Sequence, residues 1–362
     1  GDLFVAMPGV KTHGANFVIK ALELGAVAIF TDTPGKELIG ATEVPVIALE
    51  EPRKHLGELA AYVYGNTPGN VPTLFATTGT NGKTSTTYLL DAILRQIGRT
   101  TGLTSTAERH IAGEVIVSRL TTPESTEMQA LIARMRESGV TDIAVEVSAQ
   151  ALTQLRVDGL HFDVAGFTNL SHDHFDDYGG FEPYLKAKAE LFTLKRSKHA
   201  VVCLDTEYGQ RIVDLSEVPV TTISSHKDIV ADWKVEVLEE LPGLTKFSLT
   251  SASGESLVSA IPIIGSHMAA NAGLAIVMAV VAGHSFQAIK LAIKDGIDAY
   301  LPGRTELISP AGAPAVYVDF GHSPDAFLNT LAAVRKVTTG KVLMLFGADG
   351  DRDPSKREDM AK

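Results

Sequence analysis

The chain has 362 residues, 45% of them hydrophobic, which is enough for two or three domains with buried cores. Its formal net charge of −11 argues against non-specific binding to nucleic acid or to anionic membranes. The single cysteine, Cys203, rules out an intrachain disulfide and favours a reducing cytosol, so we expect a cytoplasmic protein. The longest apolar stretch, residues 268–283, is shorter than the roughly 20 residues of a membrane span and predicts a buried helix.

The first 70 residues are typical of a small α/β unit. Short apolar runs predict strands at residues 2–6, 26–30 and 44–49, and helical spacing predicts helices at 16–24 and 52–64. Turn-forming residues at 66–70 then predict a domain boundary. The chain begins inside an expected strand and stops inside an expected helix, which indicates a piece of a longer protein.

A glycine-rich loop at residues 78–86 organises the middle of the chain. An apolar run precedes it and apolar residues at helical spacing follow it, so the pattern predicts a strand, a tight loop and a helix. Glycines let backbone N–H groups approach a phosphate, Lys83 adds positive charge, and the Thr84 hydroxyl suits magnesium. Thr77 replaces the first glycine of the generic motif, so a plain glycine turn before a helix is the alternative. The strand and helix context favours a triphosphate site.

Two later apolar runs, residues 143–147 and 164–170, predict strands in the middle of a parallel sheet. The first carries Glu146, and the second leads into residues 168–177, which contain two histidines and three carboxylates. This segment alone is equally consistent with metal or phosphoryl chemistry and with a solvated acidic loop. Because ligands of open parallel sheets bind at the carboxyl ends of the strands, we expect it to lie near Glu146 and the glycine loop.

The pattern then changes twice. Alternating polar and apolar residues at 233–261 predict antiparallel strands appended to the sheet. After the apolar helix, residues 300–304 predict a second boundary, and runs at 316–319 and 342–347 predict the first strands of a third α/β unit. The sequence therefore predicts an α/β protein with domains at residues 1–70, 71–302 and 303–362.

Further motifs occur in a fixed order along the chain. They are Gly1 to Gly9, the loop at 79–84, Thr121-Thr122-Pro123, Glu146-Val147-Ser148, Gln154-Leu155-Arg156, Thr168-Asn169-Leu170, Asp173-His174, Tyr184 to Lys188 with Phe192, Asn271, Pro302-Gly303-Arg304, Asp319, His322 to Asp325 and residues 350–357. Together they resemble the Mur ligases, ATP-dependent amide-forming enzymes of peptidoglycan synthesis. The branch they resemble adds the third residue to UDP-N-acetylmuramoyl-L-alanyl-D-glutamate.

The resemblance implies a partial UDP-binding domain, a central ATP-binding domain with a parallel sheet, and a partial Rossmann-like C-terminal domain. It implies a ligase that joins an amino acid such as L-lysine or meso-diaminopimelate to the UDP-muramoyl dipeptide through an acyl phosphate. The implied cofactors are ATP and two Mg²⁺ ions, and the implied partners are the two substrates. We expect a monomer, with neither nucleic acid nor membrane insertion.

The resemblance also implies roles for individual residues. Catalytic roles fall on Lys83, Glu146, His174 and Lys188. ATP contacts fall on Gly79, Thr80, Asn81, Gly82, Lys83, Thr84, Ser85, Asn271, Arg304 and Asp319. Contacts with the muramoyl substrate fall on Thr121, Thr122, Ser148, Gln154 and Arg156. The metal ligands would be Thr84, Glu146, His174 and Lys188, the last as a carbamate (N6-carboxylysine), because an ammonium group beside Mg²⁺ would be repelled.

Two alternatives stay open at this point. A folylpolyglutamate synthetase shares a similar loop and chemistry, although residues 2–9 and Thr121-Thr122-Pro123 argue against it. A nucleotide- and UDP-sugar-binding protein without ligase activity is the other. It is motivated by Ala149, Gln150 and Met268, which depart from the family pattern.

Overall fold

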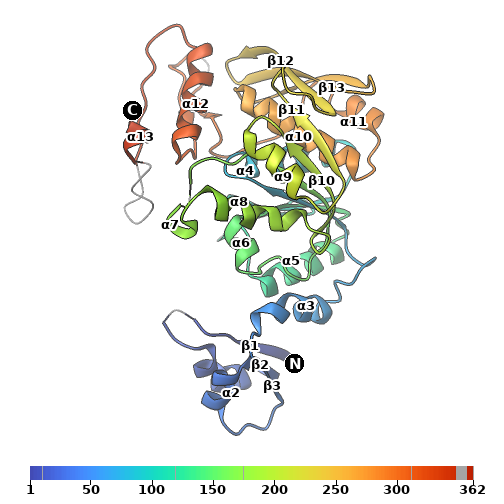
Figure 1. The fold of residues 1–362 in the computed structure, drawn as a ribbon, viewed down its shortest axis with the longest axis vertical. Helices are drawn as coiled ribbons and strands as arrows, with labels where there is room; N and C mark the ends of the chain where they lie inside the picture. Colours follow the sequence, from blue (N-terminus) through green and yellow to red (C-terminus); the bar gives the residue numbers. More distant parts are fainter. Residues whose placement is uncertain (10, 119, 174, 311, 348–356, 362) are drawn as a thin grey trace.

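The computed structural model describes the chain except residues 10, 119, 174, 311, 348–356 and 362. Its strands form a three-stranded sheet, an 11-stranded sheet and a two-stranded sheet, in chain order. Figure 1 shows the three-stranded unit at one end of the molecule, the large sheet with its helices in the middle, and the C-terminal segment beside the middle unit. In the part of the chain that the structure describes, no helix is long and apolar enough to cross a membrane.

The N-terminal unit is a parallel sheet in the order β1-β2-β3, so all three expected strands are confirmed. The expected helix at 16–24 opens with a 3₁₀ turn, and an additional helix, α2, was not predicted. The Asp32 side chain caps α2 by accepting from Gly35 N at 2.7 Å, and Pro34 occupies its first turn. The elements are β1 (Asp2–Ala6), η1 (Gly14–Phe17), α1 (Val18–Glu23), β2 (Ala26–Asp32), α2 (Thr33–Ile39), β3 (Val46–Leu49) and α3 (Arg53–Val63).

The large sheet has the order β14-β13-β12-β11-β10-β9-β4-β8-β5-β6-β7. Its middle strands are parallel, and each edge carries an antiparallel hairpin or meander. The antiparallel strands expected at 233–261 are therefore confirmed. Its strands are β4 (Thr73–Thr78), β5 (Thr101–Thr104), β6 (Glu108–Ile111), β7 (Glu114–Val117), β8 (Asp142–Glu146), β9 (Phe162–Phe167), β10 (Ser197–Cys203), β11 (Val220–Ser224), β12 (Trp233–Leu241), β13 (Leu244–Ser251) and β14 (Ser256–Ile261).

Helices cover both faces of this sheet, because successive side chains of its central strands point to opposite sides. On β4, Phe75 packs into the core under α4, α10 and α11, whereas Leu74 and Ala76 pack into the core under α5, α6, α8 and α9. The apolar stretch at 268–283 lies in α10 and is buried, as expected. The helices are α4 (Lys83–Gln96), α5 (Ser125–Glu137), α6 (Ala149–Thr153), α7 (Phe175–Tyr178), α8 (Phe181–Ala189), η2 (Glu190–Phe192), α9 (Glu207–Leu215), α10 (Ser266–Val281) and α11 (Phe286–Ala292).

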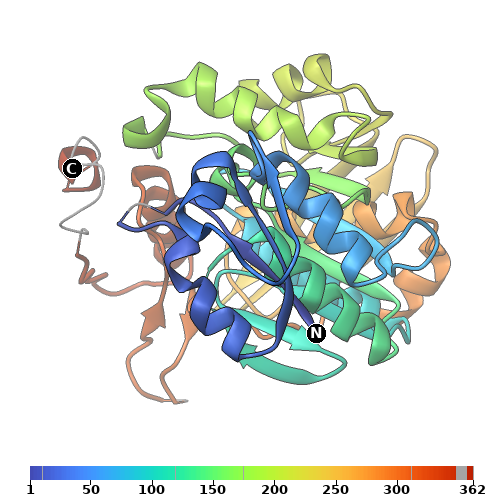
Figure 2. The ribbon, with the colours of Figure 1, turned by 90° about the horizontal axis from the view of Figure 1, so that it is seen from below.

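The C-terminal segment holds β15 (Glu306–Leu307), β16 (Tyr317–Val318), α12 (Pro324–Lys336) and α13 (Arg357–Ala361). From below, it lies to one side of the central unit (Figure 2). The strand predicted at 342–347 is wrong: these residues have no regular structure, and Leu343 and Leu345 are exposed. A buried parallel strand needs hydrogen-bonded neighbours, and no described strand pairs with this run.

Candidate active site

A cavity of about 1040 Å³ opens at the carboxyl ends of the central parallel strands. The central unit lines most of it and the C-terminal segment closes one side, so residues far apart in the sequence share one space. Of the predicted site residues, the lining includes Thr80, Asn81, Gly82, Lys83, Thr84, Ser85, Thr121, Glu146, Ser148, Gln154, Arg156, Asn271, Arg304 and Asp319. Gly79, Thr122 and Lys188 lie behind the lining. His174 falls outside the described residues.

The glycine loop ends at the first residue of α4, as the sequence predicts. Gly82 is the N-cap of this helix, in a left-handed conformation with φ of 86°, and no side chain caps the helix. A Cβ atom on Gly82 would lie 2.6 Å from Asn271 Oδ1, and one on Gly79 would collide with the Thr168 hydroxyl. The two glycines therefore let the loop pack closely against Asn271 and Thr168. The N–H groups at the start of α4 have no side-chain cap, which suits a phosphate.

The segment after β9 fixes the shape of the loop. Thr80 N donates to Asn169 O at 2.9 Å, and Asn81 N donates to the Asn169 side chain at 3.0 Å. The Thr168 hydroxyl donates to Asn81 O at 2.6 Å. Thr168 and Asn169 thus hold the backbone of the glycine loop in one conformation.

Glu146, at the end of β8, joins three other segments. Its carboxylate accepts from Thr84 Oγ1 at 2.9 Å, from Thr106 N at 2.9 Å and from Thr106 Oγ1 at 3.0 Å. Arg304 Nη2 donates to the same Thr84 hydroxyl at 3.0 Å, and Thr106 Oγ1 lies 3.0 Å from Thr121 Oγ1, a hydroxyl that can donate to it. Sequence reasoning missed Thr106, although it follows β5, a further parallel strand that ends at this edge.

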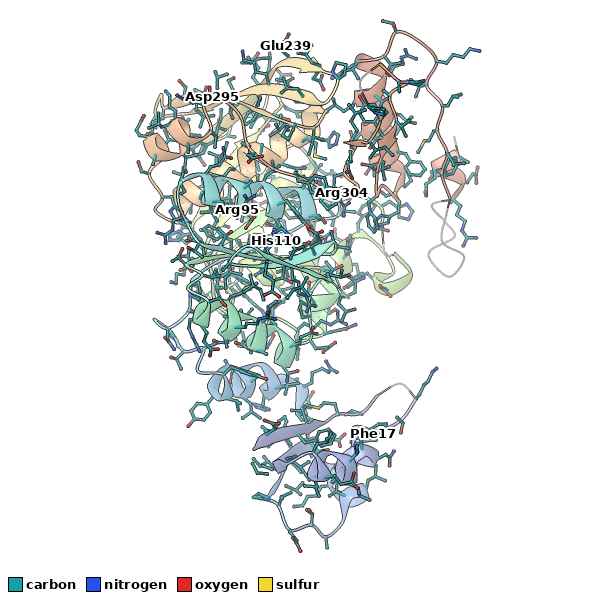
Figure 3. All side chains as sticks on the ribbon, turned by 180° about the vertical axis from the view of Figure 1, so that it is seen from behind. Phe17, Arg95, His110, Glu239, Asp295 and Arg304 are labelled. Carbon is teal, nitrogen blue, oxygen red and sulfur yellow. The ribbon has the colours of Figure 1, made fainter. Side chains whose placement is uncertain are left out.

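Two buried cations, Lys83 and Arg304, lie where the glycine loop meets α4 and suit an anionic group there. Burial lowers the pKa of Lys83, and the carboxylates of Glu146 and Asp173 partly offset this effect. Burial also lowers the pKa of Arg304, whose Nε is buried with no hydrogen-bond partner in the described part of the chain. Figure 3 shows Arg304 at the end of α4 that faces the C-terminal segment. A triphosphate would supply oxygen acceptors in addition to Thr80 O for Lys83 and the Thr84 hydroxyl for Arg304.

Lys188 is buried within α8, with only 1% of its surface exposed. Its Nζ donates to Gly79 O at 2.7 Å and lies 4.3 Å from the centre of the Tyr184 ring. Burial, helped by the charge of Lys83, places the pKa of Lys188 well below the usual lysine range. Lys186, two residues away on the same helix, is exposed, as expected.

The predicted substrate residues gather at the other side of Glu146. The Thr122 hydroxyl donates to Glu146 O at 2.9 Å and accepts from Ser148 N at 3.2 Å. Arg156 Nη1 donates to Thr122 O at 3.3 Å. The cavity is lined by Thr121, Ser148, Gln154 and Arg156. Thr122 lies behind this lining, where its hydroxyl connects the backbone of Glu146 to that of Ser148.

The third part of the cavity lies between α10 and the C-terminal segment. Asn271 Nδ2 lies 3.8 Å from Met268 Sδ, and burial lowers the pKa of the neighbouring His267. Asp319 accepts from Thr305 N at 2.8 Å and from Gly321 N at 2.7 Å, so it shapes the turn beside Arg304. The predicted motif at residues 350–357 lies outside the described residues except for Arg357.

Three family models match the chain. They are the Mur ligase family catalytic domain over residues 1–64, the Mur ligase middle domain over 77–279, and the Mur ligase glutamate ligase domain over 303–362. The middle-domain match covers the strands, loop and helices that build the cavity.

Curated relatives agree with these matches. The chain is 53% identical to the UDP-N-acetylmuramyl-tripeptide synthetase of Leifsonia xyli subsp. xyli, over 99% of this chain and 70% of the relative. It is 44% identical to the UDP-N-acetylmuramoyl-L-alanyl-D-glutamate–2,6-diaminopimelate ligase of Streptomyces avermitilis, with the same coverage. A solved ligase with the latter name superimposes with a TM-score of 0.77 at 26% identity, covering 100% of this chain and 73% of that structure. The chain belongs to the Mur ligase family, with its α/β architecture and its use of ATP.

Proposed function

We propose that this chain joins diaminopimelate or a similar amino acid to UDP-N-acetylmuramoyl-L-alanyl-D-glutamate at the expense of ATP, in the cytoplasm. The observation that carries the proposal is the single cavity in which Glu146 touches both Thr84 of the phosphate loop and the Thr106–Thr121 pair. The phosphate site and the substrate site are therefore adjacent. The names of the relatives supply the substrate class.

The reaction follows from what carboxylates and amines can do. A carboxylate does not condense with an amine at neutral pH, so its oxygen first attacks the terminal phosphorus of ATP, giving an acyl phosphate and ADP. The amine then attacks the acyl carbon, and the amide forms as phosphate leaves. Lys83, Arg304 and the N-terminus of α4 stabilise charge on the transferring phosphoryl group. Arg156 holds the substrate carboxylate in line with it.

The residues present fit one Mg²⁺ ion between the phosphate loop and β8. The Thr84 hydroxyl and the Glu146 carboxylate are oxygen ligands 2.9 Å apart. No group of three or more His, Cys, Asp or Glu side chains that could hold a metal occurs among the described residues. Mg²⁺ is commonly held by one or two protein oxygens with waters and substrate phosphates, so the small ligand set agrees with it. Bound there, the ion would neutralise phosphate charge.

Lys188 fits the proposed carbamate. Burial disfavours the ammonium form of Lys188 and lowers its pKa, which favours the neutral amine that reacts with carbon dioxide. The Gly79 carbonyl that Nζ contacts belongs to the phosphate loop, so carboxylate oxygens added to Nζ would lie beside the phosphate site. We propose that this group, with His174 and Glu146, contributes to a second Mg²⁺ site.

The domain limits 1–70, 71–302 and 303–362 are likewise a proposal, and the ranges of the three family models support them.

The test is ADP release in a coupled assay that contains ATP, Mg²⁺, UDP-muramoyl dipeptide and a panel of amino acids including meso-diaminopimelate and L-lysine. We expect ADP release that requires both the dipeptide and one member of the panel, together with a tripeptide product detected by mass. ATP binding without ADP release under any of these conditions would favour the non-catalytic alternative. A parallel assay replaces the dipeptide by a folate and supplies glutamate, and ADP release only there would favour the folylpolyglutamate synthetase alternative.

A further inference from the structure

We infer that Glu124 is a positioning residue that couples the N-terminal unit to the substrate arginine, through the ion-pair chain Arg53–Glu124–Arg156. Glu124 Oε1 lies 2.9 Å from Arg156 Nε, and Oε2 lies 3.0 Å from Arg53 Nη1. Each carboxylate oxygen therefore serves one arginine. This inference rests on the proposed function, because it assigns Arg156 to the grip on the substrate carboxylate.

The backbone at Arg156 is held in an unusual conformation. Leu155 has a left-handed φ of 59°, which a residue with a side chain adopts at a cost. It ends α6 in a Schellman motif, in which Arg156 N donates to Ala151 O at 2.8 Å and Leu155 N donates to Leu152 O at 3.2 Å. The motif fixes the backbone position of Arg156, and the contacts of its guanidinium fix the conformation of its side chain.

The Glu124 carboxylate serves the two arginines rather than the helix that begins beside it. Glu124 is the N-cap residue of α5, yet its side chain makes no cap hydrogen bond. Arg156 Nη1 donates to Thr122 O, whereas its Nε forms an ion pair with Glu124 Oε1 without hydrogen-bond geometry, so Glu124 acts on the guanidinium through its charge. The Arg156 side chain is 17% exposed and the Glu124 side chain 39%, so their pair lies partly out of solvent while the pair with Arg53 is the more strongly screened one.

The other arginine comes from the first turn of α3, in the N-terminal unit. A positive charge at a helix N-terminus is unfavourable, so the partner carboxylate explains Arg53 better than helix propensity does. Independent contacts seat α3 against the same region of the central unit. A Cβ on Gly57 would collide with Asp158 O, two residues after Arg156, and Asn66 Nδ2 donates to Gln129 O of α5 at 2.7 Å. Figure 1 shows α3 lying along α5.

The geometry gives Glu124 a specific effect on the reaction. The proposed substrate reaches from the N-terminal unit to Arg156. Through Arg53 and Glu124, the N-terminal unit orients Arg156 before the substrate carboxylate arrives. Loss of the carboxylate would leave Arg156 to adopt other rotamers and to repel Arg53. Binding of the muramoyl substrate would weaken, whereas the phosphate site, which Glu124 does not touch, would keep its geometry.

The experiment compares Glu124→Gln with a matched control, Glu114→Gln. Glu114 pairs with Arg134 of the same helix α5 at 2.7 Å, on the surface and outside the cavity lining. In the wild-type chain and both variants, kcat and KM are measured for the UDP-muramoyl dipeptide and for ATP. We expect Glu124→Gln to raise the KM for the dipeptide about tenfold. We expect its kcat, its KM for ATP and its unfolding temperature to stay near the wild-type values, and Glu114→Gln to change none of these quantities.

Two further variants sharpen the test. Arg53→Gln should raise the same KM by a smaller factor, and the double variant should match Glu124→Gln alone, because one chain of contacts carries both effects. Glu124→Asp should recover part of the affinity. Equal KM values for the Glu124→Gln and Glu114→Gln variants would overturn the inference. A wild-type chain without dipeptide-dependent ADP release would overturn the proposed function, and this inference with it.

Discussion

The two ends of the cavity are built in different ways. At the phosphate end, the backbone does most of the work: the glycine turn, the uncapped start of α4 and the Thr168-Asn169 contacts are local to the strand ends of one sheet. At the substrate end, side-chain ion pairs connect Arg156 to Glu124 and, across the sequence, to Arg53. A substitution cannot weaken a site made of backbone groups gradually, because it either leaves the loop intact or disrupts it. A substitution of one partly exposed side chain can weaken ligand binding by a moderate factor. Changes at the phosphate end should therefore abolish turnover, and changes at the substrate end should alter affinity.

The largest effect is expected for Lys83→Ala. The lysine lies at the first position of α4, where its Nζ donates to Thr80 O at 2.9 Å within the loop. Its removal takes a positive charge from the transferring phosphoryl group, so ADP release should fall by about a thousandfold. Its side chain lies in the cavity and outside the cores, so the unfolding temperature should stay close to that of the wild type. Turnover at the wild-type rate in this variant would contradict the phosphate-loop assignment.

Lys188→Ala should lower ADP release by roughly a hundredfold, because the proposed carbamate would be lost from the phosphate end. A short carboxylic acid added in excess should restore part of the activity by occupying the space of the carbamate. The matched control is Lys186→Ala, which removes an exposed lysine of the same helix and should leave activity unchanged. Full activity of the Lys188→Ala variant, or an intact lysine by carbon-13 NMR after labelling with bicarbonate, would rule out the carbamate.

Arg156→Ala should act on affinity more than on ATP use. The KM for the UDP-muramoyl dipeptide should rise by about ten- to a hundredfold, while the KM for ATP stays near its wild-type value. The control is Arg134→Ala, which removes an arginine from a surface ion pair with Glu114. Equal losses of affinity for the two ligands would mean that Arg156 does not belong to the substrate end.

The same contrast explains what could be predicted from the sequence. The strand, the glycine turn and the helix at the phosphate end follow from local patterns, and the structure contains them where the sequence predicts them. The roles of the residues around Lys83 stay a prediction. Helical phase also separates Lys188 from Lys186, because only Lys188 shares the buried face with Tyr184, four residues earlier. Contacts between distant segments have no such signal, and Thr106 and Glu124 were missed for this reason.

Two errors in the fold have the same origin. Helix α2 was missed although Asp32 and Pro34 mark its start, because the adjoining apolar run was interpreted as a strand alone. The run at 342–347 was assigned to a strand by composition, but a strand is defined by its neighbours, and no described strand pairs with it. Local chemistry thus predicts elements, while pairing and ion-pair partners depend on the whole fold.

The smallest effect concerns pH, and it arises between α4, the helix that follows the glycine loop, and β6. Burial disfavours a charged His110, but the carboxylates of Asp91 on α4 and Glu108 on β6 outweigh this and raise the pKa of His110 above its usual value. A raised pKa in the folded state stabilises the protein fully below the ordinary histidine pKa of about 6.5, and this stabilisation disappears as pH rises through the folded value. His110 therefore fastens α4 to β6 more firmly in mild acid.

His110→Gln should lower stability by roughly 1 kcal/mol at pH 6 and by clearly less at pH 9, because only the charged imidazole gains from the two carboxylates. The measurement is the difference between the urea unfolding midpoints of wild type and variant at the two pH values. His161→Gln is the control, since His161 is exposed and contacts the carbonyl of Leu194 rather than a carboxylate. A difference for His110→Gln that is the same at pH 6 and pH 9 would show that the ring contributes only by packing against Tyr88, whose ring centre lies 5.4 Å away.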